Sequence, residues 1–189
     1  QANSDDGWLL LAQLRDGCVS DAKKLEPIQH LVLDIKKQWP ATGLTLRMDT
    51  GFNSPILLDF LDEEGVDYEC GYPATSSVKS KVLDVSEDVE EEFRRVYGEP
   101  KYVGKGKNDR WNEDHQRIQA LPAEERMKAL EAQGARRVRR IVEEMHDGQG
   151  WDKERRLIIR VDYSDKGLDV RCVVTSKKYG LPERIYEED

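Results

Sequence analysis

The most restrictive pattern in the chain lies in residues 44–71, where two short strand-like segments flank a helix that opens with proline. Residues 44–48 alternate between apolar and polar side chains, which is typical of a half-buried strand, and this segment runs directly into Asp49. Ser54 followed by Pro55 predicts the start of a helix, and Gly65 predicts its end. Residues 66–71 predict the second strand. This order indicates an α/β layer, in which the carboxyl end of a strand, the position of Asp49, usually carries the chemistry.

The same alternation of elements extends towards the start of the chain. The short apolar run of residues 8–12 suits a buried strand, and Asp21 is placed to cap a helix that closes before Pro40. The apolar residues of this helix recur at steps of three and four: Leu25, Ile28, Leu31, Val32 and Ile35. Residues 1–72 are therefore interpreted as one α/β core.

After residue 72 the composition becomes polar and charged, which predicts an insertion over residues 73–135 without a large core. Residues 89–97 and 123–132 favour helices on its surface. Residues 138–145, 157–163 and 168–175 return to strand patterns, with a hairpin turn at residues 164–167. They predict a β meander that forms a strand subdomain over residues 136–176, and residues 177–189 are expected to begin a last core helix.

Composition excludes several classes of protein. The 189 residues carry a formal net charge of -8, from 30 Lys and Arg against 38 Asp and Glu, so the chain is not uniformly basic. Residues 136–160 nevertheless hold a local surplus of about three positive charges, and nucleic acid responds to such a local distribution. No apolar run approaches the roughly 20 residues that a membrane span needs.

The three cysteines are odd in number and widely spaced, without a Cys-x-x-Cys pair, which favours reduced, buried thiols and a cytoplasmic protein. His30, His115 and His146 have no partner at the spacing of a metal site or a nucleophile relay. The first residues contain neither an initiating Met nor a signal sequence, so the chain is expected to begin inside a longer protein.

Two regions together resemble one known family. Residues 47–61 read RMDTGFNSPILLDFL and residues 64–68 read EGVDY, and these motifs are similar to the segment around the second catalytic Asp of DDE-type insertion-sequence transposases, DDE domain group 1. The later motifs, Gly150-Trp151, ERRLIIRV at residues 154–161 and RCVVT at residues 171–175, resemble the β insertion of that family. The resemblance covers most of the chain except about residues 78–134.

The resemblance implies an RNase H-like catalytic core in which two Asp and one Glu hold a pair of Mg²⁺ or Mn²⁺ ions for DNA cleavage and strand transfer. Two such ions clamp the attacking and the leaving oxygen of a phosphoryl displacement, and carboxylates supply the hard oxygen ligands that they prefer. Asp49 matches the second ligand of the family. Without the resemblance, an Asp at a strand end is more often a cap or turn residue.

The chain also departs from the family pattern. The resemblance places the first Asp on a strand before Gln1, and the Glu on a helix after the β insertion, within a Tyr-x-x-Arg-x-x-x-Glu pattern. Glu187 and Glu188 are not assigned that role, because no Arg lies between Tyr186 and either of them. The core is thus expected to be incomplete, with its first strands and last helix missing, as in an internal or truncated fragment.

Five residues are candidates for DNA binding. Trp151 resembles a residue of related transposases that stacks on a flipped base, and its alternative is a ring packed under the meander. The other candidates are the arginines Arg139, Arg140, Arg155 and Arg156, which contact either phosphates or solvent.

The sequence therefore predicts a transposase fragment whose partner is DNA, with a homodimer allowed in the complete protein. The first alternative is a DNA-binding or interaction remnant without activity. The second is an unrelated α/β protein without a role on nucleic acid, which the net charge of -8 favours.

Overall fold

The computed structural model describes residues 21–104 and 106–187, and the chain divides into two units, residues 1–42 and 43–189. In the first unit the described residues form α1 (Asp21–Gln38). This confirms the helix expected between Asp21 and Pro40, and Leu25 and Val32 on one of its faces are buried. The strand expected from residue 8 lies outside the described residues.

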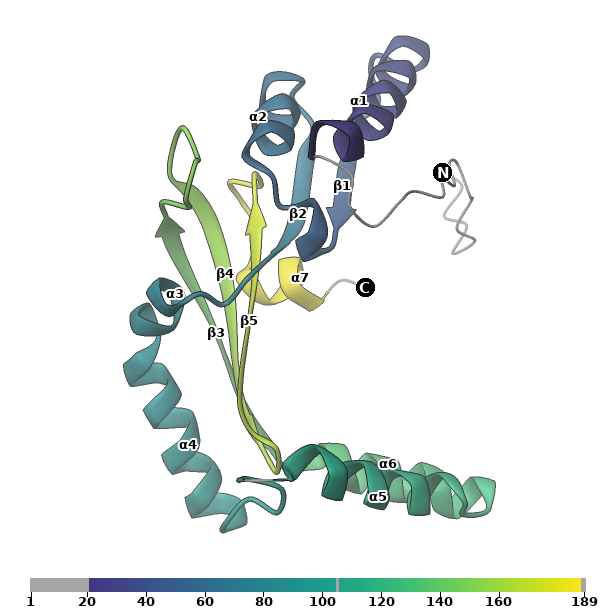
Figure 1. Ribbon diagram of the computed structural model, residues 1–189, viewed down its shortest axis with the longest axis vertical. Coiled ribbons are helices and arrows are strands. Elements are labelled where there is room, and N and C mark those ends of the chain that lie inside the picture. Colours follow the sequence, from purple (N-terminus) through teal and green to yellow (C-terminus); the bar gives the residue numbers. More distant parts are fainter. Residues whose placement is uncertain (1–20, 105, 188–189) are drawn as a thin grey trace. The chain divides into compact units, whose positions relative to one another are not determined.

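The second unit contains a five-stranded mixed sheet of order β1-β2-β5-β4-β3 (Figure 1). Strand β1 (Thr45–Met48) pairs in parallel with β2 (Asp67–Tyr72), and α2 (Pro55–Glu63) connects them. The predicted strand–helix–strand unit is therefore present. Pro55 occupies the first turn of α2, as expected, but the Ser54 side chain makes no capping hydrogen bond.

Strands β3 (Arg137–His146), β4 (Arg155–Ser164) and β5 (Gly167–Thr175) form the predicted antiparallel meander. Ser164 pairs with Gly167 across a two-residue turn, and Gly167 has a φ of +86°, which glycine adopts without strain. Strand β5 also pairs antiparallel with β2. The meander therefore continues the sheet that contains β1 and β2.

The described residues between β2 and β3 form four helices: α3 (Ser76–Lys81), α4 (Leu83–Tyr97), α5 (Lys107–Gln119) and α6 (Ala123–Ala135). The short helix α7 (Pro182–Glu187) follows β5. Within the described residues, no helix is long and apolar enough to cross a membrane.

The insertion contributes to the core, which corrects one expectation. Helix α4 lies along β3 and β4, and its residues Val89 and Phe93 are fully buried, as are Val78 and Val82 before them (Figure 1). The expectation of a surface helix is wrong for α4, because a few apolar residues one helical turn apart suffice to bury one face of an otherwise acidic helix. In α5 and α6, by contrast, no described side chain is fully buried.

Candidate active site

Asp49 follows directly after β1 and starts the single 3-10 turn η1 (Thr50–Phe52). Its Oδ1 accepts a hydrogen bond from the Gly51 N–H at 2.7 Å. The side chain is exposed, and Oδ2 accepts no hydrogen bond from any residue that the structure describes. One carboxylate oxygen thus fixes the turn while the other remains accessible to a ligand.

Residues Cys70 and Gly71 of strand β2 contact this turn. A Cβ atom at Gly71 would lie 2.7 Å from Thr50 Oγ1 and 2.8 Å from the Thr50 nitrogen, so glycine alone permits the observed approach. The Cys70 thiol donates to the Asp49 carbonyl oxygen at 3.5 Å. Burial, with a further contribution from the Asp49 charge, raises the pKa of Cys70 to about 12, so this thiol is a packing group.

The strand register places α7 on the same face of the sheet as the Asp49 turn. Thr50 packs on Gly71, and Gly71 pairs with Val173 of β5. Arg171 lies two residues before Val173, on the same face of β5, and it pairs with Arg160 of β4. The Arg160 guanidinium lies 5.1 Å from the centre of the Tyr186 ring in α7. A polypeptide segment that leaves α7 therefore starts on the face that carries Asp49.

The four arginines that are candidates for DNA binding are divided between the two faces of the sheet. Side chains alternate along a strand, so the adjacent pairs Arg139-Arg140 and Arg155-Arg156 each place one arginine on either face. Arg139 and Arg156 share the face of Tyr186, whereas Arg140 and Arg155 lie on the opposite face. These four residues therefore do not form one continuous basic surface.

Arg155 belongs to the protein interior, with a side chain only 2% exposed. Its guanidinium contacts Asp59 and Asp62 of α2 and donates to the Tyr68 hydroxyl at 2.7 Å and to Asp152 at 3.1 Å. Burial by itself would lower the pKa of this guanidinium, but the hydrogen bond to Asp62 and the neighbouring charges raise it. The residue ties α2 to β4, and a phosphate would reach it only by displacing a carboxylate.

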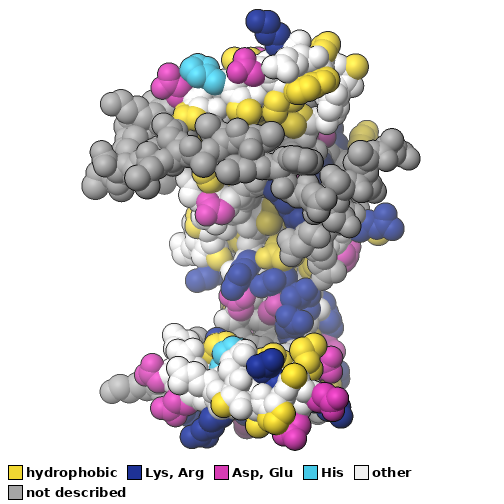
Figure 2. Space-filling model, turned by 90° about the vertical axis from the view of Figure 1, so that its right-hand side faces the viewer, with side chains coloured by type: hydrophobic (Ala, Val, Ile, Leu, Met, Phe, Trp, Pro, Cys, Tyr) yellow, Lys and Arg dark blue, Asp and Glu magenta, His cyan; other side chains and the backbone are white. Residues whose placement is uncertain are grey.

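The other three arginines also have acidic partners. Arg139 binds both oxygens of Asp162, at 2.8 and 3.1 Å. Arg140 contacts Glu92 of α4. Arg156 binds both oxygens of Glu143, at 2.9 and 2.8 Å. Figure 2 accordingly shows Lys and Arg side chains interspersed with acidic ones on the face in view. The local surplus of positive charge counted from the sequence is largely offset by these pairs.

Trp151 is half-buried in the turn between β3 and β4. Its ring centre lies 5.2 Å from that of Tyr72, 5.8 Å from that of His146 and 5.6 Å from the Arg155 guanidinium carbon. A Cβ at Gly148 would lie 2.5 Å from the indole ring, so the turn closes tightly on it. Tyr72, His146 and Trp151 line a cavity of about 490 Å³ together with polar residues of the turn. The packed ring that was the alternative for Trp151 matches these contacts.

Comparison with known proteins shows to which family the chain belongs. Residues 3–189 match the family model described as transposase DDE domain group 1. The chain belongs to this family. No curated protein and no solved structure matches it. Membership removes the alternative of an unrelated α/β protein, and it connects the chain with transposition-related DNA cleavage, for which DDE transposases generally use divalent metal ions.

The described part of this DDE domain does not itself fit a two-metal site. No three His, Cys, Asp or Glu side chains gather within residues 21–104 and 106–187 into a group that could hold a metal ion. Asp49 has the hard oxygen that Mg²⁺ prefers, but one carboxylate does not anchor two ions that are slow to release their water.

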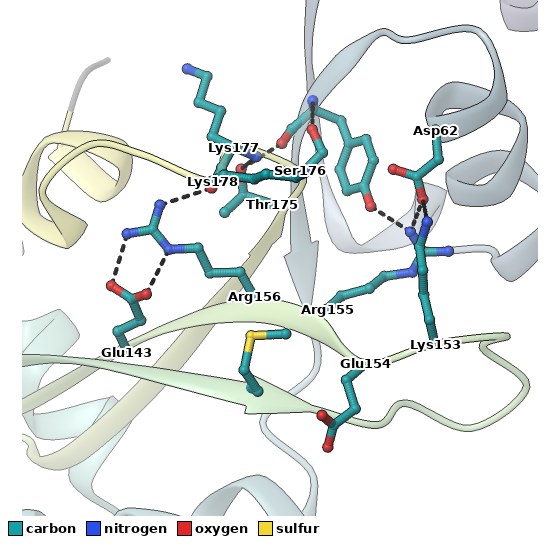
Figure 3. A pocket seen from close by; sticks show the side chains of 12 residues that line it. Asp62, Glu143, Lys153, Glu154, Arg155, Arg156, Thr175, Ser176, Lys177 and Lys178 are labelled. Atoms are coloured by element: carbon teal, nitrogen blue, oxygen red, sulfur yellow. Dashed lines mark hydrogen bonds and ion pairs between the residues drawn. The ribbon is translucent and has the colours of Figure 1, made fainter.

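One feature of this DDE domain was missed from the sequence. A cavity of about 450 Å³ opens beside the residues that follow β5 (Figure 3). Its lining includes Lys153, Lys177 and Lys178, none of which was a candidate. The sequence could have indicated this site through the consecutive residues Lys177, Lys178 and Tyr179, because surfaces that bind single-stranded nucleic acid combine basic groups with aromatic rings.

Proposed function

We propose that the chain is part of the catalytic domain of an insertion-sequence transposase with an RNase H-like core, and that Asp49 is one of the carboxylates that bind its metal ions. The observation that carries the proposal is the exposed Asp49 carboxylate at the carboxyl end of β1, whose Oδ1 accepts the Gly51 N–H while Oδ2 has no hydrogen-bond partner among the described residues. Membership of the DDE family supplies the reaction, which is metal-dependent cleavage and joining of DNA.

The remaining ligands are assigned outside the described residues. The resemblance places an Asp on a strand before Gln1 and a Glu on a helix beyond α7. The position of Tyr186 on the sheet face that carries the Asp49 turn supports the second assignment, because a continued α7 would start on the correct side of the sheet. The role of Asp49 in this chain is to present a fixed carboxylate to the ions.

DNA is the proposed partner, with Trp151, Arg139, Arg140, Arg155 and Arg156 as the contacts proposed from the sequence. The exposed part of the Arg140 side chain, about half, is accessible to a phosphate, which would compete with Glu92 for it. Arg155 lies against the half-buried Trp151 ring, with its guanidinium carbon 5.6 Å from the ring centre. A homodimer in the complete protein and a cytoplasmic location belong to the same proposal.

A nicking assay with Mn²⁺ on a transposon-end duplex tests the assignment of Asp49. We expect no cleavage by the 189-residue chain and cleavage by a longer protein that includes both flanking carboxylates. In the longer protein Asp49→Asn abolishes cleavage, because the amide keeps the shape but not the charge that balances the metals. Asp84→Asn, at an exposed carboxylate of α4, is the matched control and keeps full activity. Activity in the Asp49→Asn variant would place the chemistry on another residue.

The second candidate is a DNA-binding remnant without activity. Both candidates leave Asp49 as the single expected ligand within residues 21–104 and 106–187, so the difference between them lies in the flanking segments. The same assay separates the two, since a remnant binds DNA but stays inactive when the flanking segments of its own gene are included.

A further inference from the structure

The loop of residues 176–181, between β5 and α7, exposes an aromatic ring to solvent. Tyr179 is 87% exposed, the largest exposed fraction of any large hydrophobic residue that the structure describes, and Leu181 nearby is 62% exposed. Tyrosine usually covers its ring and leaves only the hydroxyl in water. A ring presented in this way is suited to contact with a partner.

Arg156 fixes the backbone of the loop (Figure 3). Its guanidinium donates to the carbonyl oxygens of Lys177 at 2.8 Å, Gly180 at 2.9 Å and Tyr179 at 3.5 Å. Glu143 holds the same guanidinium from the other side. The loop is thus ordered before any partner binds, and binding does not have to order its backbone.

The electrostatics of the loop favour an anionic partner. Lys178 is exposed and has no hydrogen-bonded or ionic partner in the described part of the chain. The cavity of about 450 Å³ beside the loop is lined by five basic and three acidic side chains. An anion at this position would therefore gain an ammonium group that no carboxylate of the described residues already neutralises.

An exposed aromatic ring that follows an unpaired lysine in sequence matches one ligand better than others. A nucleic-acid strand presents a base face and a phosphate together, whereas in a duplex the bases are already stacked on one another. Trp151 is less suited to this contact, because its ring is half-buried beside Tyr72 and His146.

We propose that residues 176–181 bind single-stranded DNA, with the Tyr179 ring stacked on an unpaired base and the Lys178 ammonium group on a phosphate. The choice of DNA rests on the proposed function. Arg156 is the positioning residue of this site, since it acts on the ligand through the loop backbone.

Fluorescence anisotropy of the 189-residue chain with a labelled 20-nucleotide strand, alone and annealed to its complement, tests the proposal. Tyr179→Ala is expected to weaken single-strand binding by about tenfold and Tyr179→Phe by less than about twofold, because stacking needs the ring but not the hydroxyl. Lys178→Gln is expected to lower the slope of log affinity against log salt by about 0.7, the value for one phosphate contact on a single strand. Met127→Ala and Lys128→Gln, at exposed positions on α6, are the matched controls and leave binding unchanged.

Binding by Tyr179→Ala within twofold of the unsubstituted chain overturns the proposal, as does tighter binding to the duplex than to the single strand. A change of oligomeric state in Tyr179→Ala with unchanged DNA binding assigns the ring to a second copy of the chain, and also overturns it. If the longer protein cleaves DNA through Asp49 while Tyr179→Ala binds normally, this proposal alone fails. If neither DNA form binds and the longer protein does not cleave, the proposed function fails with it.

Discussion

Replacing Arg155 by methionine tests how strongly one buried charge holds α2 to the sheet. The guanidinium is almost inaccessible to water and contacts both Asp59 and Asp62 of α2. Methionine keeps much of the side-chain volume beside Trp151 but leaves Asp59 without its cationic partner and Asp62 with Lys153 alone, at 3.1 Å. Removing one partner of a buried ion pair typically costs about 3 to 5 kcal/mol. The lower end, about 3 kcal/mol, applies here because water still reaches the partly exposed carboxylates.

Urea unfolding followed by tryptophan fluorescence measures this loss. With a slope of about 2 kcal/mol/M, a loss of about 3 kcal/mol lowers the unfolding midpoint by about 1.5 M. The matched control is Arg95→Met on the exposed side of α4, which is expected to change stability by less than about 0.5 kcal/mol. A loss below about 1 kcal/mol for Arg155→Met would show that the cluster does not hold α2, and would refute the argument.

The pH dependence of the same variant has a definite sign. Burial, followed by the Asp152 charge, raises the pKa of Asp59, while Arg155 lowers it. Without Arg155 this pKa rises further. A pKa that is higher in the folded state than in the unfolded state means that folding disfavours the ionised carboxylate. The resulting loss of folding stability is therefore complete above the folded-state pKa of Asp59, and it disappears as the carboxylate becomes protonated at lower pH. The deficit of Arg155→Met is therefore largest near neutral pH and becomes smaller in acid.

Two further predictions concern the turn at Asp49 and the buried thiols. Gly71→Ala places a Cβ within 2.8 Å of the Thr50 backbone, so it is expected to displace the Asp49 turn. Urea unfolding is expected to show a loss of stability of about 1 to 3 kcal/mol, and the nicking assay is expected to show reduced cleavage by the longer protein. Burial raises the pKa of Cys70 to about 12 and that of Cys172 to about 11, so both thiols are expected to stay unreactive towards a thiol-specific reagent at pH 8 until the protein unfolds. Rapid labelling of Cys70 or Cys172 in the folded protein, located by mass spectrometry of its peptides, would contradict this.

The sequence predicted the elements whose local pattern is strong. The Pro55-led helix, the strand that ends before Asp49 and the meander with its turn at residues 164–167 are all present. The burial of α4 was missed because its acidic run, residues 87–92, favoured a surface helix, and the spacing of apolar residues in a helix does not show what the helix packs against. The exposure of Tyr179 was missed for a related reason, since the exposure of a ring depends on tertiary structure.

The arginines show why a count of charges along the chain overstates the capacity to bind DNA. The count treats Arg139, Arg140 and Arg156 as one surface, but the two-residue repeat of a strand separates neighbours onto opposite faces, and each meets a carboxylate there. A phosphate that takes over such an arginine releases a carboxylate, so the exchange gains less than a new contact and releases fewer counterions. A lysine without a partner releases its counterions in full. In an acidic chain, exposed cations without an acidic partner, such as Lys178, are therefore expected to contribute more per residue to DNA affinity than the paired arginines of the strands.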